Sequence, residues 1–175
     1  MATDQAVLMD RIYRHQRHIY DLSRKFFLLG RDQAIADLAA RPGEAVLELG
    51  CGTARNLIRM ARRYPEARFF GLDASAAMLA TARHAVAHAG LAERIVLRQG
   101  LAERADPAAD FGLAQGFDAV LLSYSLSMIP PWRAVLERSV SILAPQGRLL
   151  VVDFYTQARL PGWFRWGLGH WLARF

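Results

Sequence analysis

The chain has 175 residues, of which 53% are hydrophobic and 22% charged, the balance of a single soluble α/β or α+β domain. Its only cysteine is Cys51, so the sequence excludes both a disulfide framework and a zinc cluster built from cysteines. No apolar stretch approaches the roughly 18 residues that span a bilayer. Asp4 and Asp10 interrupt the first ten residues, where a signal peptide would be apolar, so a cytoplasmic protein is predicted.

The formal net charge is +6, and most of it comes from one early segment. Between residues 11 and 31, six basic residues stand against Asp21 alone, which accounts for five of the six charges. The basic residues are Arg11, Arg14, Arg17, Arg24, Lys25 and Arg31. Such a segment favours an anionic partner. Nucleic acid, an anionic membrane surface and an acidic small molecule all remain open.

Two helices are expected before the first strand. Apolar or ring-bearing residues recur at steps of four and three over residues 8–29, which predicts a long amphipathic helix that ends at Gly30. A shorter helix then follows Asp32, its predicted N-cap, and ends before the turn at residues 41–43. Residues 1–41 are therefore expected to form a helical cap on a main domain of residues 42–175.

Compact apolar runs alternate with helical patterns through the main domain. Strands are predicted at residues 45–50, 68–73, 95–99, 117–124 and 148–154. Helices are predicted at residues 53–64, 75–90, 132–143 and 161–175, and a loop with room for one helical turn at residues 102–115. Strands that are apolar almost throughout are buried on both faces, so the sheet is expected to be parallel, with helices on both sides. This is a doubly wound α/β fold.

In an open parallel sheet, ligands bind beyond the carboxyl ends of the strands. The first strand leads there into a Gly50-Cys51-Gly52 turn, in which the glycines let the backbone approach a ligand closely. A dinucleotide site would need a third glycine where the chain has Arg55, which disfavours a nicotinamide cofactor. With no pyrophosphate to accommodate, Glu48 can face a cationic or hydrogen-bond-donating group of the ligand.

Asp73 ends the second strand, twenty-one residues after Gly52. A carboxylate at that place can accept hydrogen bonds from both hydroxyls of a ribose. A nucleoside without phosphates therefore fits both the glycine turn and the acid. The alternative is that Asp73 only caps the helix that begins near Ser75.

Five segments, taken together and in order, resemble the successive motifs of class I S-adenosylmethionine-dependent methyltransferases. They are Val46–Thr53, Gly71–Ser75, Gln99–Gly100, Phe117–Val120 and Leu143–Leu149. The resemblance implies a Rossmann-like fold with S-adenosylmethionine as the cofactor. Members of that family usually add two strands after the helix that follows strand five, so the resemblance also implies a chain that lacks them.

The resemblance also implies which residues hold the cofactor. It assigns the methionyl part to Gly50, Cys51 and Gly52, the ribose to Asp73, and the adenine to Met78, Gly100, Leu101 and Ala102. The predicted cofactor set further includes Glu48, Thr53, Ala74, Ser123 and Tyr20, the last as a tyrosine that covers the cofactor or as a core aromatic. Two residues depart from the family pattern. Ala54 replaces a frequent glycine, and Leu101 replaces a frequent adenine-binding aspartate but still offers its backbone N–H and an apolar wall.

Segments outside these motifs are similar to a narrower group. Residues 13–32, 123–130 and 160–164 resemble the N-methyltransferase of betaine-lipid synthesis, which trimethylates the amine of diacylglyceryl-homoserine. This resemblance implies a lipid amine as the methyl acceptor, bound at a membrane surface. Tyr20-Asp21 and residues 30–33 are also similar to quinone-pathway C-methyltransferases, so a quinone precursor is the alternative acceptor.

Methyl transfer from a sulfonium is an in-line displacement, so the protein mainly has to position the two reactants. Ser123, Tyr124 and Ser125 follow the fourth strand and are predicted to orient the acceptor; alternatively, they only satisfy backbone groups at the strand end. An α-amino group titrates at roughly 7.7 to 8.0, and burial beside a cation would deprotonate it, so no general base is assigned. His15 and His18 are expected either to relay a proton or to be packed or solvated residues of the helix.

Basic and aromatic residues occur together near both ends of the chain. The early helix combines arginines with Tyr13 and Phe26, and the tail holds Trp163, Trp166 and Trp171, a composition typical of a membrane interface. Both segments could equally pack as a lid on the core. Peripheral contact with the inner face of the membrane is favoured. Nucleic acid is not expected as a partner, because the sequence shows no recognised RNA-binding module and no Asn-Pro-Pro-Tyr-type tetrapeptide after the fourth strand. The alternative that is not an enzyme is a nucleic-acid-binding protein that uses the basic helix to contact phosphates.

Overall fold

A computed structural model describes residues 30–153 and residue 162 of the chain. The predicted helix at residues 8–29, including His15, His18 and Tyr20, lies outside the described residues, as does nearly all of the predicted tail helix. The division of the chain at residue 41 stays a prediction.

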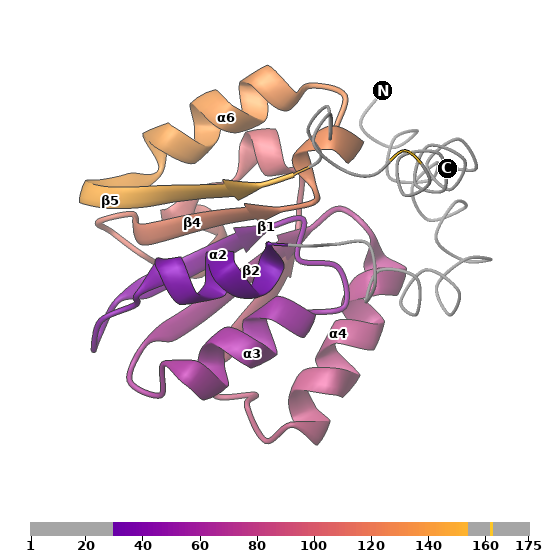
Figure 1. The fold of residues 1–175 in the computed structure, drawn as a ribbon, viewed down its shortest axis with the longest axis vertical. Helices are drawn as coiled ribbons and strands as arrows, with labels where there is room; N and C mark the ends of the chain where they lie inside the picture. The colour runs from indigo at the N-terminus through magenta and orange to yellow at the C-terminus, as the bar shows by residue number, and fades with distance from the viewer. Residues whose placement is uncertain (1–29, 154–161, 163–175) are drawn as a thin grey trace.

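Five parallel strands form a single sheet in the order β3-β2-β1-β4-β5 (Figure 1). The strands are β1 (Ala45–Leu49), β2 (Arg68–Asp73), β3 (Ile95–Gln99), β4 (Phe117–Ser123) and β5 (Leu143–Val152). The central strand β1 is buried at every position, as its apolar sequence predicts. The doubly wound parallel fold is therefore confirmed. Because the order reverses between β1 and β4, their carboxyl ends mark the switch point at which such sheets bind ligands.

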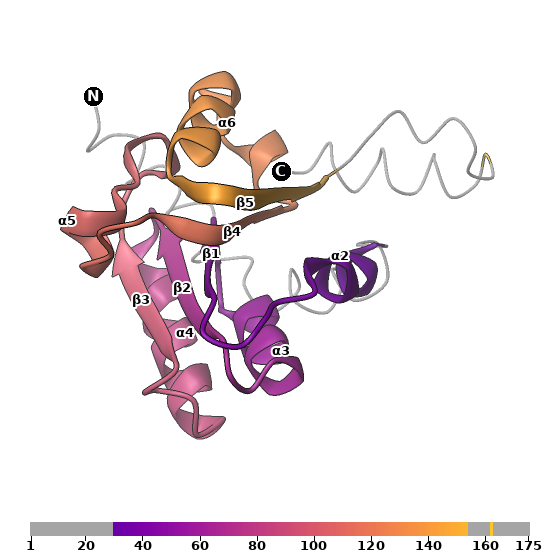
Figure 2. The same cartoon turned by 90° about the vertical axis from the view of Figure 1, so that its left-hand side faces the viewer.

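Helices cover both faces of the sheet (Figure 2). One face carries α2 (Arg31–Leu38), α3 (Arg55–Arg63) and α4 (Ala76–His88). The other carries α5 (Pro107–Phe111), α6 (Trp132–Ser141) and the short 3-10 turns η1 (Ala102–Arg104) and η2 (Leu126–Met128). A hydrophobic core lies between the sheet and the helices on each face, and alternate residues of β1 pack into the two cores. Val46 packs on the face that carries α2 and α3, and Leu47 packs on the face that carries α6. None of the described helices is long and apolar enough to cross a bilayer.

The predicted boundaries are close to the observed ones wherever a glycine or a cap ends an element. Ser75 caps α4 as predicted, with its Oγ accepting a hydrogen bond from the Met78 N–H at 3.2 Å. The prediction that Asp32 caps the second helix is wrong, because that helix begins at Arg31 and its N-cap is Gly30, two residues before Asp32 and in a left-handed conformation. The helix predicted from Thr53 starts at Arg55, because Ala54 also adopts a left-handed conformation, with φ +61°.

Two predictions about the second half of the chain need correction. Residues 102–115 hold η1 and α5 rather than one helical turn, and α5 begins where the Asp106 side chain accepts hydrogen bonds from two backbone N–H groups. Leu143, predicted as the last helical residue, is instead the first residue of β5 and pairs with Phe117. The register of β5 then shifts before Arg148 pairs with Ala119, an irregularity that depends on a distant strand and leaves no periodic signal in the sequence.

Candidate functional site

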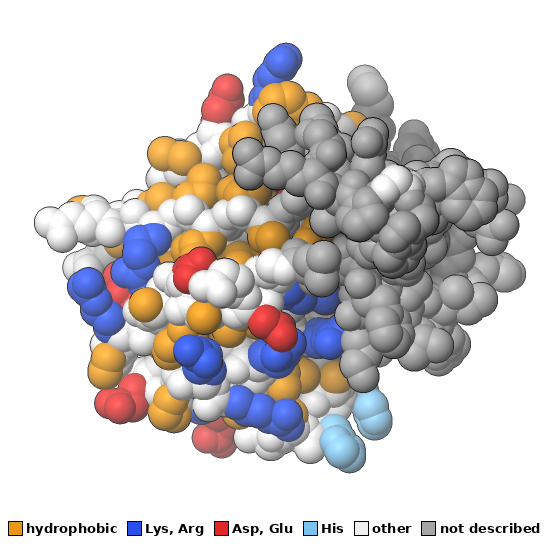
Figure 3. Space-filling model, viewed as in Figure 1, with side chains coloured by type: hydrophobic (Ala, Val, Ile, Leu, Met, Phe, Trp, Pro, Cys, Tyr) orange, Lys and Arg blue, Asp and Glu red, His pale blue; other side chains and the backbone are white. Residues whose placement is uncertain are grey.

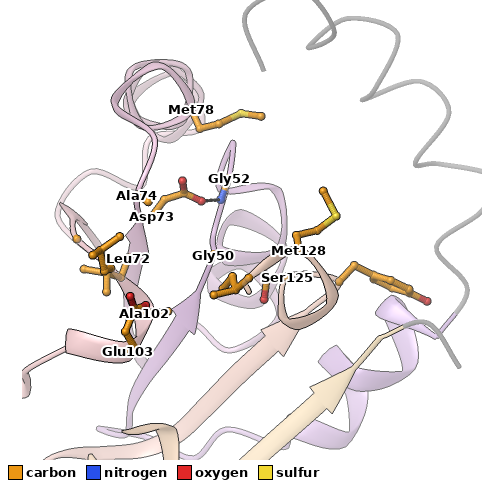
Figure 4. Close-up of a pocket in the computed structure, with 14 residues that line it drawn as sticks. Gly50, Gly52, Leu72, Asp73, Ala74, Met78, Ala102, Glu103, Ser125 and Met128 are labelled. Atoms are coloured by element: carbon orange, nitrogen blue, oxygen red, sulfur yellow. Dashed lines mark hydrogen bonds between the residues drawn. The ribbon is translucent and has the colours of Figure 1, made fainter. Parts of the chain in front are cut away.

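A cavity of about 740 Å³, including the space open to solvent at its mouth, lies at the carboxyl ends of β1, β2 and β4 (Figure 4). Its walls come from α4 and from the segments at the carboxyl ends of β1, β2, β3 and β4. The cavity therefore lies at the switch point of the sheet, where the sequence predicts a site. The lining residues are Gly50, Gly52, Leu72, Asp73, Ala74, Met78, Gly100, Leu101, Ala102, Glu103, Tyr124, Ser125, Met128 and Ile129.

The glycine turn after β1 is closely packed against the end of β4. Gly50 has φ +70°, and a Cβ added to it would lie 2.6 Å from the Ser125 Cβ, so both its conformation and its surroundings require glycine. The Ser125 Oγ donates a hydrogen bond to the Leu49 carbonyl at 2.9 Å. The Ser125 hydroxyl therefore satisfies a strand-end backbone group, which was the alternative to its predicted role in orienting the acceptor.

The Asp73 carboxylate is held in one orientation by the backbone. One of its oxygens accepts a hydrogen bond from the Gly52 N–H at 2.8 Å (Figure 4). The other accepts one from the Ser75 N–H at 2.9 Å. The capping of α4 belongs to Ser75, so Asp73 instead links the glycine turn to the start of that helix. Each carboxylate oxygen has more than one lone pair, so both can also accept hydrogen bonds from the two hydroxyls of a ribose.

An apolar slot extends from Asp73 toward η1. Leu72 and Met78 are buried in its walls, and Leu101 adds a third apolar side chain. Gly100 lets its backbone pack closely against Leu72, since a Cβ there would come within 3.0 Å of the Leu72 Cδ1. A flat heteroaromatic ring suits such a slot, and Glu103 offers it a carboxylate at the edge. The residues at hand therefore fit a nucleoside.

A second, polar crevice of about 300 Å³ adjoins the first cavity, and Gly50 lines both. Its other lining residues are Arg31, Glu48, Cys51, Thr53, Arg55, Asn56 and Ser123. The predicted cofactor residues are thus divided between two spaces. Glu48, Cys51, Thr53 and Ser123 line the crevice, and the residues predicted to hold the ribose and the adenine line the large cavity. We call this second space the polar crevice.

Polar groups are buried in the polar crevice. The Asn56 Nδ2 donates a hydrogen bond to the Glu48 Oε1 at 2.7 Å, and both side chains are buried. Burial raises the pKa of the Cys51 thiol well above its usual value, and the nearby carboxylates of Asp73 and Glu48 raise that pKa further. Cys51 therefore stays a neutral thiol and does not act as a nucleophile at neutral pH.

Tyr124 lines the large cavity and packs against Arg31, a residue that lines the polar crevice. It is buried and has φ +53°, a left-handed conformation that costs a residue other than glycine about 1–3 kcal/mol. The Arg31 guanidinium lies 5.7 Å from the centroid of the Tyr124 ring. Burial raises the pKa of the phenol, Arg31 opposes that rise and Asp153 adds to it. The phenol is therefore neutral at physiological pH and can donate a hydrogen bond.

The structure adds several residues that the sequence analysis did not assign to the site. They are Leu72, Glu103, Met128 and Ile129 in the large cavity, and Arg31, Arg55 and Asn56 in the polar crevice. Met128 and Ile129 follow the fourth strand, so their position at the carboxyl edge was a usable signal. Arg31 comes from a helix that precedes the sheet, and nothing local in the sequence indicates its position.

Comparisons with known proteins agree with this geometry. Residues 46–147, more than half of the chain, match the family described as "Methyltransferase domain". The chain therefore belongs to the class I S-adenosylmethionine-dependent methyltransferases, and S-adenosylmethionine is its cofactor. The usual sheet of this fold has seven strands, and the described residues hold five.

One curated relative and two solved structures define how far the similarity extends. The demethylmenaquinone methyltransferase of Listeria monocytogenes is 30% identical over 143 residues, which cover 81% of this chain and 57% of that enzyme. The YcgJ protein of Bacillus subtilis has a TM-score of 0.62 at 23% identity, covering 72% of this chain and 50% of that one. A Geobacter sulfurreducens methyltransferase in complex with S-adenosyl-L-homocysteine has a TM-score of 0.55 at 22% identity, covering 69% and 46%. The two structures share the fold, and the chain spans just over half the length of the curated relative.

Proposed function

We propose that the protein transfers the methyl group of S-adenosylmethionine to a ring carbon of a quinone precursor. The observation that carries this proposal is the 30% identity, over 81% of the chain, to an enzyme named demethylmenaquinone methyltransferase. Its name agrees with the quinone-pathway acceptor that the sequence analysis held as the alternative, and not with the betaine-lipid enzyme. The acceptor chemistry is therefore proposed as C-methylation.

The donor side of the site supports the proposal through its fit to a nucleoside. Asp73 would hold the ribose, and Leu72, Met78 and Leu101 would enclose the adenine. When bound, S-adenosylmethionine supplies a methyl group on a sulfonium, an electrophile open to in-line attack. The protein contributes mainly by positioning, an effect that can lower such a barrier by roughly 7 to 11 kcal/mol.

The acceptor side supports a flat apolar substrate. Met128 and Ile129 offer half-buried apolar side chains, and the neutral Tyr124 phenol beside them can donate a hydrogen bond to a ring oxygen. A reduced ring held between these groups would present one carbon to the donor; as the new C–C bond forms, the bond between the methyl group and the sulfonium sulfur would break, and the proton of that ring carbon would be released to water. In this role Tyr124 orients the acceptor and does not remove a proton from it.

Methylation of a lipid amine at a membrane surface is the second candidate. The basic and aromatic residues of segments 11–31 and 161–175 favour it, and α3 carries four arginines and no acidic residue. Figure 3 shows basic side chains over the α2–α3 layer, with acidic ones among them. A lipid amine is therefore the competitor that an acceptor assay has to include.

The test uses the full chain with methyl-labelled S-adenosylmethionine and offers two acceptors in parallel. One is a reduced demethylmenaquinone with a short side chain, and the other is diacylglyceryl-homoserine in vesicles. We expect label on the quinone ring, abolished by Asp73→Ala because the ribose contact is lost. The Tyr124→Phe variant should lower kcat and leave donor affinity unchanged. Label on the lipid amine, with none on the ring, would replace the proposal by the second candidate.

A further inference from the structure

Two buried polar atoms of residues that line the polar crevice have no hydrogen-bond partner within the described part of the chain. The Asn56 Oδ1 and the Ser123 Oγ have no hydrogen-bond partner among the described residues, although these residues are only 5% and 3% exposed. Leaving such an atom unsatisfied costs about 1–3 kcal/mol. Both atoms line the same crevice, so a ligand group that hydrogen-bonds there would remove both costs.

The charges of the polar crevice indicate what kind of group that is. Arg31 lines it from α2 and is only 7% exposed, and Glu48 lines it from β1. A zwitterionic α-amino acid matches this pair: its carboxylate suits the planar guanidinium fork, and its ammonium suits the acceptors on Glu48 and Asn56. Because Gly50 lines both spaces, one ligand can occupy the large cavity and the polar crevice together.

The Arg31 guanidinium packs over the ring of Tyr124. It lies within the roughly 6 Å range of a cation–π contact with the ring. The end of β5 supports both partners: the Tyr124 N–H donates to the Val152 carbonyl at 2.7 Å, and Val152 also approaches Gly30, the residue before α2. Arg31 precedes the matched family region of residues 46–147, so this contact comes from an element outside it.

We propose that Arg31 binds the carboxylate at the amino-acid end of the methyl donor and that the Tyr124 ring positions the Arg31 guanidinium for this contact. The inference deepens the proposed function, on which it rests only for the identity of the donor. Tyr124 would thereby serve both sides of the reaction: its ring would position Arg31, and its hydroxyl would donate the hydrogen bond to the acceptor that is proposed above.

Two ligands that share a nucleoside test the Arg31 contact. S-adenosyl-L-homocysteine carries the amino-acid end, and 5′-methylthioadenosine lacks it. By titration calorimetry we expect Arg31→Ala to weaken S-adenosyl-L-homocysteine binding roughly thirtyfold and to change methylthioadenosine binding less than about threefold. Arg83→Ala is the matched control, since Arg83 is an exposed arginine of α4 that lines neither the large cavity nor the polar crevice, and it should leave both affinities nearly unchanged.

Tyr124 is tested in the same assay. Tyr124→Phe keeps the ring and should keep the affinity for S-adenosyl-L-homocysteine. Tyr124→Leu should weaken it about fivefold, and only while Arg31 is present, because a cation–π contact needs both partners. Equal losses with and without Arg31 would refute the positioning role.

The outcomes separate this inference from the proposed function. If Arg31→Ala weakens both ligands equally, or neither, the carboxylate contact is refuted while the proposed methyl transfer stands. If the wild-type protein binds neither ligand, the donor assignment fails and the proposed function fails with it. No acceptor is present in these titrations, so the identity of the acceptor does not affect them.

Discussion

Gly50 shows how one residue of the site depends on a partner far along the chain. Its φ of +70° and the 2.6 Å approach of an added Cβ to Ser125 oppose any side chain. Gly90 has φ +69° and no atom within 4 Å of its added Cβ, so it isolates the conformational cost alone. We expect Gly90→Ala to lower the free energy of unfolding by about 1–2 kcal/mol and Gly50→Ala to lower it by about 1–3 kcal/mol more, in urea titrations.

A second variant identifies the origin of the difference. Adding Ser125→Gly to Gly50→Ala removes the Cβ that is approached too closely, so the double variant should lose less stability than the sum of the single variants. Strict additivity would mean that the surroundings of Gly50 relax without cost. The Gly50-Cys51-Gly52 pattern predicts the turn, but Ser125 lies seventy-six residues beyond its bonding partner Leu49, at a distance that only the folded chain closes.

At the scale of elements, Arg94 joins the end of α3 to the start of β3. Its guanidinium donates hydrogen bonds to the carbonyls of Ala61, Tyr64 and Ala67, at 2.8, 2.8 and 3.1 Å. The last carbonyls of a helix have no hydrogen-bond donor within it, so Arg94 supplies a donor to the Ala61 carbonyl in the last turn of α3. We expect Arg94→Ala to lower the free energy of unfolding by about 2–3 kcal/mol, measured by urea denaturation.

Two further variants make that result specific. Arg94→Lys should recover little of the loss, because an ammonium cannot reach three carbonyls as the guanidinium fork does. Arg83→Ala, at an exposed position on α4, should change stability by less than about 0.5 kcal/mol. Equal losses for Arg94→Ala and Arg83→Ala would mean that the three hydrogen bonds do not stabilise the fold.

At the scale of the whole molecule, an ion pair connects the start of β1 to the edge strand. Arg148 on β5 donates two hydrogen bonds to the Glu44 carboxylate, at 3.1 and 2.6 Å, across 104 residues of chain. The hydrogen bond from Arg148 is the main reason that the Glu44 pKa lies below its ordinary value of 4.5, and burial partly opposes it. A carboxyl whose pKa is lower in the folded state stabilises the fold above its unfolded pKa, and this contribution is lost as the pH falls through the folded pKa.

We expect the difference in unfolding free energy between wild type and Glu44→Gln to depend on pH. Glu44→Gln should be less stable than wild type at pH 7, and the difference in unfolding free energy should shrink as the pH falls below 4.5. In an Arg148→Met background, the Glu44→Gln substitution should lose most of this pH dependence. A difference that stays constant from pH 7 to pH 3 would contradict the assignment.

The amino-acid sequence by itself determined the elements and the chemical character of the site. Four of the five strands lie within one residue of their predicted bounds, because apolar runs and turn residues act locally. For the same reason, Gly50, Gly52 and Asp73 were found where strands end. The fifth strand was predicted to begin too late, because its register shift depends on pairing with β4.

Only the tertiary structure decided which residues meet. It divided the predicted cofactor residues between the large cavity and the polar crevice, and it brought Arg31 and Asn56 to the polar crevice. It also turned the Ser125 hydroxyl toward the backbone of β1. The physical reason is that hydrophobic patterns and turn residues act over only a few positions of the chain. A contact between α2 and the end of β4, by contrast, forms only when the order and register of the strands are fixed.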